Sequence, residues 1–223
     1  MDLLVRLLGA YLLGSVNGAL LVGRLAGGVD IRTQGSGNAG GTNALRTQGP
    51  AFAFAVLLID ILKGWLAAAW LGTLPLPAPV TSAGAALGLA WSPVVCALAA
   101  IVGHVWPLFH GFRGGKGVAT LLGAVAGLVP GQLLGVLGVW LVMMGLFGFV
   151  GLASIVATAA LPVLLLLRPP PGVDLTPLLV FGVACALLVA WTHRGNLQRM
   201  GAGSEPRSRR LWLLGKLRSR TRA

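Results

Sequence analysis

The chain alternates between long apolar runs and short polar segments. Seven apolar runs approach the size of a membrane-spanning helix, which needs about 20 apolar residues. Val118–Val129 is the short one, and only Gly151 separates two of the runs that follow it. We predict an all-α polytopic membrane protein with seven transmembrane helices, and keep five as the alternative. The runs are Leu3–Val22, Ala51–Gly72, Ser82–Val102, Val118–Val129, Leu133–Val150, Leu152–Leu167 and Pro177–Trp191.

Composition supports this interpretation. The chain has 223 residues, of which 56% are hydrophobic and 10% charged, whereas soluble domains carry about 25% charged residues. That excludes an ordinary soluble domain and a disordered chain. We therefore treat residues 1–223 as a single integral membrane domain that ends in a basic tail, residues 203–223.

Charge sets the expected orientation. Residues 24–50, 103–117 and 192–223 hold 14 of the 17 Lys and Arg residues. Loops rich in Lys and Arg usually lie on the cytoplasmic side of a membrane. We therefore expect these segments on the cytoplasmic face, with the N-terminus outside and the C-terminus in the cytoplasm. The basic residues lie between apolar runs, so no nucleic acid partner is expected. The tail suits anionic membrane lipid.

The second run contains Asp60 and Lys63, three residues apart. On a helix this spacing places both side chains on one face, close enough to pair. Charges inside a membrane are costly, so such residues are functional or structural candidates. We expect a structural ion pair.

Two polar loops have the composition of anion-binding sites. The segment 29–46, VDIRTQGSGNAGGTNALR, is rich in Gly, Ser, Thr and Asn, and glycine lets backbone amides converge on an anion. In the second loop, Gly114, Gly115 and Gly117 surround Lys116, which suits phosphate. This loop is not a Walker A motif, because Lys116 is followed by glycine. For His104 nearby, a structural hydrogen-bonding role is the alternative to substrate contact.

A third polar segment begins at the end of the last run. His193 and Asn196 are three residues apart, and can move a proton and bind a hydroxyl or oxyanion. We expect Glu205 to form a salt bridge with a nearby arginine. The three histidines lack carboxylate or cysteine neighbours at ligand spacing, so no metal or other cofactor is expected. A transporter or flippase of a phosphorylated lipid is the alternative to an enzyme, but transport favours polar residues at the bilayer midplane.

Three motifs occur in order along the chain: GSGNAGGTNALR (35–46), GHVWPLFHGFRGGKGVAT (103–120) and HRGNLQRMGAGSE (193–205). Together with YLLGSVNGALLVGRL (11–25), they resemble the bacterial acyl-phosphate:glycerol-3-phosphate acyltransferase family (PlsY). The resemblance covers the whole chain. Its departures are mild, such as Asn17 where that family has proline and Gly41 where it has alanine.

The resemblance implies transfer of an acyl group from a fatty acyl-phosphate to the 1-hydroxyl of sn-glycerol 3-phosphate, giving 1-acyl-glycerol 3-phosphate and phosphate. This is the first acylation of bacterial phospholipid synthesis. We expect a monomer in the bacterial cytoplasmic (inner) membrane, and the charge distribution places its active site on the cytoplasmic face. The implied catalytic residues are Ser36, Arg46, His193 and Asn196, and Glu205 is structural. The resemblance implies glycerol 3-phosphate binding by Gly114, Gly115, Lys116 and Gly117. From their chemistry and position we also expect substrate contact by Asn38, Thr42, Asn43 and His104.

Overall fold

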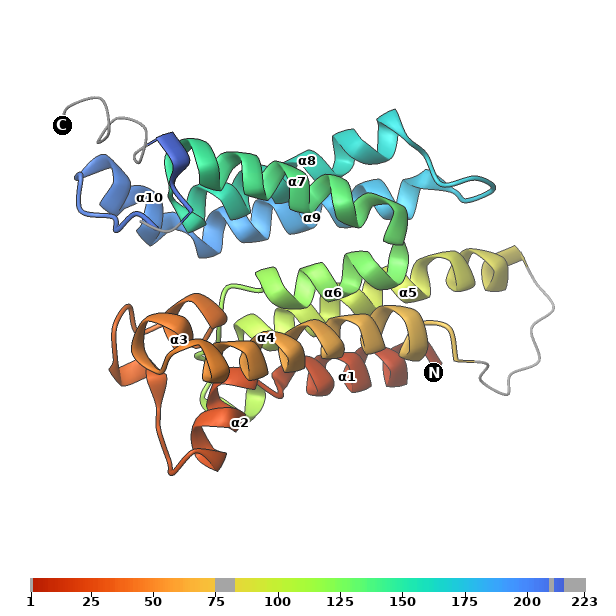
Figure 1. Ribbon diagram of the computed structural model, residues 1–223. Helices are drawn as coiled ribbons and strands as arrows, with labels where there is room; N and C mark the ends of the chain where they lie inside the picture. The colour runs from red at the N-terminus through yellow and green to blue at the C-terminus, as the bar shows by residue number, and fades with distance from the viewer. Residues whose placement is uncertain (1, 75–82, 209–210, 215–223) are drawn as a thin grey trace. The chain divides into compact units, whose positions relative to one another are not determined.

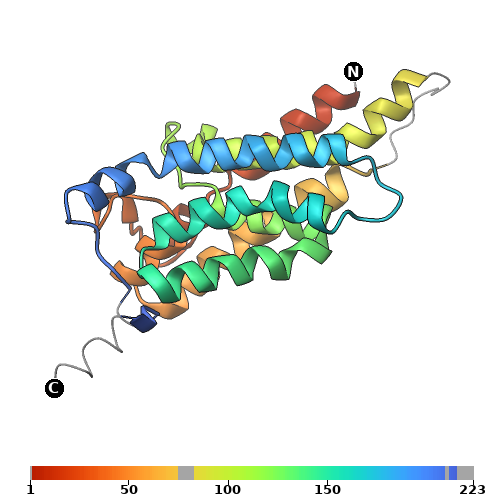
Figure 2. The same ribbon diagram turned by 90° about the horizontal axis from the view of Figure 1, so that it is seen from above.

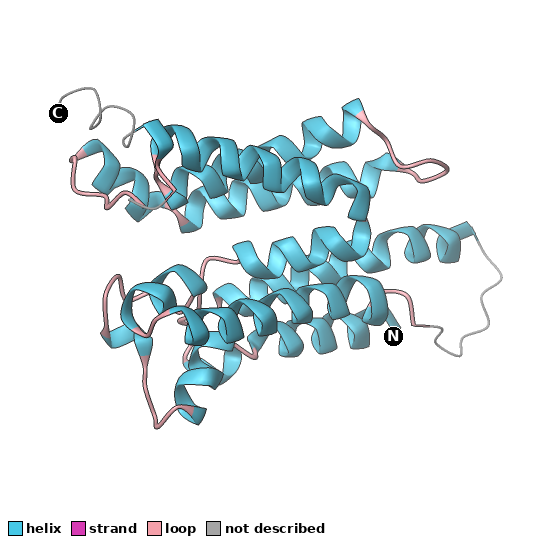
Figure 3. Cartoon of the chain, in the orientation of Figure 1, coloured by secondary structure: helices cyan, strands magenta, loops and turns pink. Residues whose placement is uncertain are grey.

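The computed structural model describes residues 2–74, 83–208 and 211–214, and every regular element in these ranges is a helix (Figure 3). The chain divides into two compact units, Met1–Pro130 and Gly131–Ala223. One membrane domain can contain two such units, so the single-domain expectation stays a prediction. Much of the predicted tail lies outside the described residues, as does Ser82, where the third apolar run was expected to begin.

The first unit is a cluster of helices whose polar loops gather at one end (Figure 1). Most of its apolar runs form α-helices, and a π-helix, η2, continues α4. Its elements are α1 (Asp2–Ser15), α2 (Gly18–Leu25), η1 (Ile31–Thr33), α3 (Gly41–Thr47), α4 (Pro50–Trp65), η2 (Leu66–Leu71), α5 (Ala83–Val105), η3 (Leu108–His110) and α6 (Val118–Leu128).

Glycines allow these helices to approach closely. A Cβ atom at Gly14 of α1 would overlap the carbonyl of Ala100 in α5. One at Gly64 of α4 would overlap the carbonyl of Thr120 in α6. Small residues permit such backbone contact between apolar helices in lipid. The contacts fix α4 against α6 and α1 against α5, and so fix the polar residues that α4 and α5 carry.

The predicted first span, Leu3–Val22, is a bent pair instead of one straight helix. The helix axis bends by 48° between α1 and α2. Asn17 lies in the bend, is fully buried, and accepts hydrogen bonds of 3.1 and 3.2 Å from two amides in the first turn of α2. A polar residue inside the apolar run thus caps the second helix.

The second unit contains α7 (Pro130–Phe147), α8 (Val150–Leu167), α9 (Leu175–Thr192) and α10 (Arg194–Gly201). α8 and α9 lie side by side (Figures 1 and 2), with Gly182 of α9 against Pro162 inside α8. α7 turns into α8 at Gly148, whose φ is 74°. The predicted boundary at Gly151 therefore lies within the first turn of α8.

The beginning of the predicted tail docks on this turn. The Arg207 guanidinium lies 4.6 Å from the Phe149 ring centre and 4.2 Å from that of Trp212. Trp212 Nε1 donates to the carbonyl of Leu146 at 3.2 Å. The other Lys and Arg residues of the tail all lie outside the described residues, so lipid binding there stays a prediction.

Within the described residues, five helices are long and apolar enough to cross a membrane, or six if the bent α1–α2 pair is one span. α6 has 11 residues and is about 16 Å long, against about 30 Å for the hydrocarbon core. The predicted count of seven is therefore not confirmed. The orientation of the ends stays a prediction. The five helices are Pro50–Leu71, Ala90–His110, Pro130–Phe147, Val150–Leu167 and Leu175–Thr192.

Candidate active site

The first polar loop is held from within by Asn43, which is 1% exposed. Its Oδ1 accepts a hydrogen bond from the amide of Ser36 at 2.9 Å, and its Nδ2 donates to the carbonyls of Ile31 at 2.9 Å and Gln34 at 3.0 Å. Both amide hydrogens are therefore used inside the loop. This favours a positioning role for Asn43 over the direct substrate contact that the sequence predicts.

The loop presents other predicted residues at its surface. Ser36, Thr42 and Arg46 are exposed, and Asn38 is half-buried. Ser36 lies between two glycines in the left-handed region, with φ of 56° before it and 72° after it. The side chains of Ser36, Thr42 and Arg46, which we expect to contact phosphate, are thus accessible. The side-chain amide of Asn43, which holds the loop, is buried.

The glycine-rich loop folds back onto the end of α5. The amide of Gly114 donates to the carbonyl of Val105, and the amide of Gly115 to that of His104, both at 3.1 Å. A Cβ atom at Gly115 would overlap Nε2 of His104. These two glycines allow close approach to α5, and their amides complete its last turn. We therefore expect phosphate to meet this loop at Lys116 and Gly117, just before α6.

A buried network lies beneath this loop. Lys63 Nζ is 2.9 Å from Asp60 Oδ1 and 2.9 Å from His104 Nδ1, and His104 Nδ1 is 3.3 Å from Asp60 Oδ1. Each of the three side chains is at most 3% exposed. The predicted Asp60–Lys63 ion pair is present, and His104 joins it as a third member that the sequence spacing could not show.

The same lysine completes the bend between α1 and α2. Its Nζ donates to the carbonyls of Gly14 at 2.9 Å and Val16 at 2.8 Å. Asp60 Oδ1 accepts from the amide of Gly18 at 3.1 Å. The network therefore joins the bend, α4 and α5, and reaches the glycine-rich loop through the His104 ring. This geometry favours the structural alternative for His104 over direct substrate contact.

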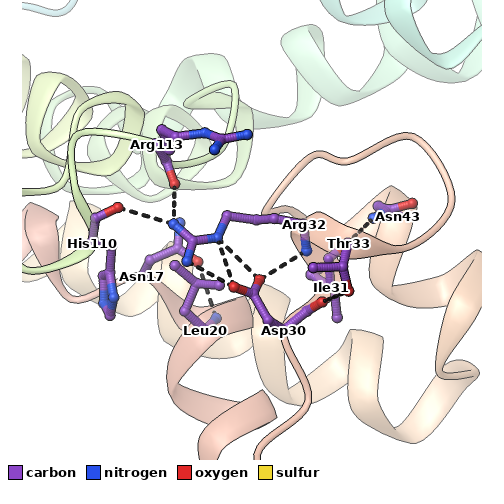
Figure 4. Close-up of polar contacts among 9 residues, drawn as sticks. All are labelled: Asn17, Leu20, Asp30, Ile31, Arg32, Thr33, Asn43, His110 and Arg113. Atoms are coloured by element: carbon purple, nitrogen blue, oxygen red, sulfur yellow. Dashed lines mark hydrogen bonds and ion pairs between the residues drawn. The ribbon is translucent and has the colours of Figure 1, made fainter.

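A second ion pair joins the two polar loops (Figure 4). Arg32 Nη2 is 2.7 Å from Asp30 Oδ2, and Arg32 Nη1 donates to the carbonyls of His110 at 2.9 Å and Arg113 at 3.2 Å. The hydrogen bond from Arg32 holds the pKa of Asp30 below its ordinary value. The composition of this loop predicts an anion site and does not single out Asp30, although an acid two residues before an arginine is the available signal.

In the second unit, His193 lies at the end of α9 and is 4% exposed. Its Nδ1 is 2.8 Å from the carbonyl oxygen of Val189. Because a carbonyl only accepts, Nδ1 carries the hydrogen, and Nε2 is the acceptor of the neutral ring. The imidazole is thus held in one tautomer by its own helix.

Asn196 and Glu205 form one cluster on α10 and the segment after it. Asn196 Nδ2 donates to Glu205 Oε1 at 2.6 Å, and Arg199 Nε donates to Glu205 Oε2 at 2.7 Å. The predicted salt bridge of Glu205 with a nearby arginine is therefore confirmed. A Cβ atom at Gly151 would lie 2.9 Å from the Cβ of Asn196, so glycine there lets α8 approach α10.

The long apolar helices define a multi-pass membrane protein, and the polar loops of its first unit carry hydroxyl, amide and basic side chains. The profile of the glycerol-3-phosphate acyltransferase family matches residues 4–203. The chain therefore belongs to the glycerol-3-phosphate acyltransferase family, as the three motifs predict. Within the described residues, no group of three or more His, Cys, Asp or Glu side chains is placed to hold a metal ion.

Individual relatives cover nearly the whole chain. A glycerol-3-phosphate acyltransferase of Synechococcus sp. (strain JA-2-3B'a(2-13)) is 42% identical over 209 residues, which are 94% of this chain and 96% of the relative. One from Thioalkalivibrio sulfidiphilus (strain HL-EbGR7) is 43% identical over 202 residues, covering 90% and 91%. The similarity is thus not confined to the motifs.

Two crystal structures of the integral membrane glycerol 3-phosphate acyltransferase PlsY (YgiH) have the same fold. The glycerol 3-phosphate form has a TM-score of 0.79 and 33% identity, covering 93% of this chain and 96% of that one. The lysophosphatidic acid form has a TM-score of 0.78 and 33% identity, covering 96% and 99%. Family and fold favour an acyltransferase over the transporter alternative.

Proposed function

We propose that this protein transfers the acyl group of a fatty acyl-phosphate to the 1-hydroxyl of sn-glycerol 3-phosphate, giving 1-acyl-sn-glycerol 3-phosphate and inorganic phosphate. The observation that carries the proposal is the full-length similarity to PlsY, a glycerol 3-phosphate acyltransferase seen in glycerol 3-phosphate and lysophosphatidic acid forms. The accessible Ser36 and Arg46 and the loop around Lys116 supply the chemistry that two phosphate-bearing substrates need.

The transfer needs positioning more than a strong nucleophile. The donor is a mixed anhydride, so the hydroxyl oxygen attacks the acyl carbon, the bond from that carbon to the phosphate oxygen breaks, and phosphate leaves. Lys116 and Arg46 hold phosphate charge, while Ser36, Thr42 and Asn196 donate hydrogen bonds to phosphate or the developing oxyanion.

The hydroxyl proton has two candidate acceptors, a substrate phosphate oxygen and His193. The hydrogen bond from Nδ1 to Val189 makes Nε2 the acceptor of neutral His193, which supports the imidazole as an acceptor. A His193→Gln variant distinguishes them. If the imidazole accepts the proton, kcat of wild type falls in acid as His193 becomes protonated, and the variant loses this fall. An unchanged dependence of kcat on pH supports the phosphate.

In this mechanism Ser36 is a hydrogen-bond donor and forms no acyl-enzyme, because the donor is already activated. The test mixes labelled acyl-phosphate with enzyme in the absence of acceptor and quenches in acid. Stable label on a peptide containing Ser36, discharged by glycerol 3-phosphate, would replace direct transfer with a two-step reaction.

The site belongs on the cytoplasmic face of a bacterial inner membrane, in a monomer. The distribution of basic residues over loops 24–50, 103–117 and 192–223 supports the cytoplasmic face. Maleimide labelling of Gly28→Cys and Gly172→Cys in intact cells tests the orientation. Labelling of Gly172→Cys alone by an impermeant reagent is expected, and labelling of Gly28→Cys alone would reverse the topology.

The deciding experiment uses purified protein in lipid nanodiscs with palmitoyl phosphate and glycerol 3-phosphate. Phosphate and lysophosphatidate should appear in equal amounts, and only when both substrates are present. Palmitoyl-CoA in place of the acyl-phosphate should give no product. Equal turnover with palmitoyl-CoA would overturn the donor assignment, and uptake of glycerol 3-phosphate into proteoliposomes without acylation would favour a transporter.

A further inference from the structure

We infer that Asp30 and Arg32 form an inter-loop clamp, a positioning pair that holds the glycine-rich loop and its Lys116 in place against the loop that carries Ser36. The clamp sets the affinity for glycerol 3-phosphate without touching substrate. The inference rests on the proposed function and adds two residues that the motifs did not mark as part of the site.

The hydrogen bonds of Arg32 show that it is a bridge and not a phosphate ligand. Its Nε donates to Asp30 at 3.0 and 3.1 Å, and its Nη2 donates to the same carboxylate at 2.7 Å. Its Nη1 donates to two carbonyls of the second loop, those of His110 and Arg113 (Figure 4). Four of the five N–H donors of a guanidinium can be satisfied by these partners.

Asp30 is itself fixed, so it can orient the arginine. Its Oδ1 accepts from the amide of Arg32 at 2.9 Å, and its carbonyl accepts from the amide of Thr33 at 3.1 Å and from the Thr33 hydroxyl at 2.8 Å. The carboxylate therefore caps the short η1 turn and pairs with a side chain from that turn. Arg32 leaves this turn in one defined direction, toward the second loop.

The same turn is tied to Ser36 on its other side. Asn43 donates to the carbonyls of Ile31 and Gln34 and accepts from the amide of Ser36. Residues 30–34 thus lie between two sets of hydrogen bonds, one to the second loop and one to Ser36. A change in the clamp should therefore alter the position of one phosphate-binding loop relative to the other.

The second loop has a backbone that needs such support. Phe112 has φ of 57° and is the one non-glycine residue with positive φ among the described residues; Gly111 before it has φ of 63°. A left-handed conformation is unfavourable at a bulky residue and persists only where surrounding contacts hold it. The two carbonyls that Arg32 binds, those of residues 110 and 113, lie on either side of Gly111 and the strained Phe112.

The test compares Arg32→Ala, Arg32→Lys, Asp30→Asn and the double variant D30N/R32A in nanodiscs. Arg24→Ala is the matched control, because Arg24 is exposed on the last turn of α2. We expect R32A to raise KM for glycerol 3-phosphate by about fivefold or more, which is about 1 kcal/mol, with kcat within about twofold of wild type. The double variant should resemble R32A, and R24A should resemble wild type.

Hydrogen exchange supplies a readout that is independent of substrate. The amides of Gly114 and Gly115 are bonded to α5, so their exchange should accelerate in R32A and D30N. R32K keeps the positive charge but loses the planar guanidinium group with its paired N–H donors. Its KM should lie between those of wild type and R32A. If R32A does not fold, R32K replaces it in the test. Unchanged KM and unchanged exchange would overturn the clamp. A wild type without acyl transfer would refute the proposed function, while exchange would still test the clamp.

Discussion

The first unit contains two ion pairs of the same chemistry in opposite surroundings. Asp60 and Lys63 are 2.9 Å apart with side chains 1% and 3% exposed. Asp30 and Arg32 are 2.7 Å apart with side chains 40% and 24% exposed. The buried pair holds helices together around a bend, whereas the exposed pair holds two loops together. Burial, not distance, separates the two roles.

The difference shows how the surroundings decide what an ion pair contributes. Removing one partner of a buried pair leaves a charge without solvent or counter-ion, at about 3–5 kcal/mol. An exposed pair contributes about 0–1 kcal/mol, so its value lies in the geometry that it imposes. The buried pair should therefore control folding, and the exposed pair should control substrate affinity.

The largest expected effect follows from Lys63→Met. This change takes the lysine partner away from the buried Asp60 and removes the donor to Gly14 and Val16, so we expect a loss of about 3–5 kcal/mol. Thermal melting in detergent measures it, with the exposed Arg24→Met as control. A melting temperature equal to wild type would show that the buried network does not hold the helices.

A smaller effect is expected from Gly115→Ala. The new methyl group would overlap Nε2 of His104 and would lie 2.8 Å from the carbonyl oxygen of Ala39, so the loop must shift, at about 1–3 kcal/mol. Both the melting temperature and the KM for glycerol 3-phosphate should change. In the control Gly131→Ala, the methyl group meets nothing within 4 Å. Equal behaviour of the two variants would contradict the contact.

Lys116→Ala tests whether the loop that the exposed ion pair holds binds glycerol 3-phosphate. We expect at least about a tenfold rise in KM for glycerol 3-phosphate, or about 1.4 kcal/mol of charge-assisted binding. Steady-state kinetics in nanodiscs measure it. Unchanged kinetics in the folded variant would leave this loop as a marker of topology only.

The smallest effect concerns pH and the exposed pair. The hydrogen bond from Arg32 lowers the pKa of Asp30 in the folded protein. Its contribution is therefore present above the ordinary carboxyl pKa and is lost as the pH falls through the lower folded-state value. Near neutral pH, the free energies of unfolding of wild type and D30N should differ by less than about 1 kcal/mol. Their melting temperatures should therefore lie close together and should become equal in acid. A gap that widens in acid would contradict the assignment.

Local features of the sequence could be predicted more fully than features that depend on tertiary contacts. Spacing along a helix predicts the Asp60–Lys63 pair, and composition predicts polar loops near Ser36 and Lys116. The third member, His104, comes from another helix and is found only once α4 and α5 are placed. The positioning role of Asn43 likewise depends on where the loop folds over it. Asn17 inside the first apolar run is the local signal for the bend that hydropathy alone misses.

The bend between α1 and α2 also bears on how the chain enters the membrane during synthesis. The carbonyls of Gly14 and Val16 find their donor in Lys63, which belongs to a later helix. A bilayer offers no water to replace that donor. We therefore expect the α1–α2 segment and α4 to move from the insertion machinery into the lipid together. A nascent chain that ends before Lys63 should be released into the lipid inefficiently.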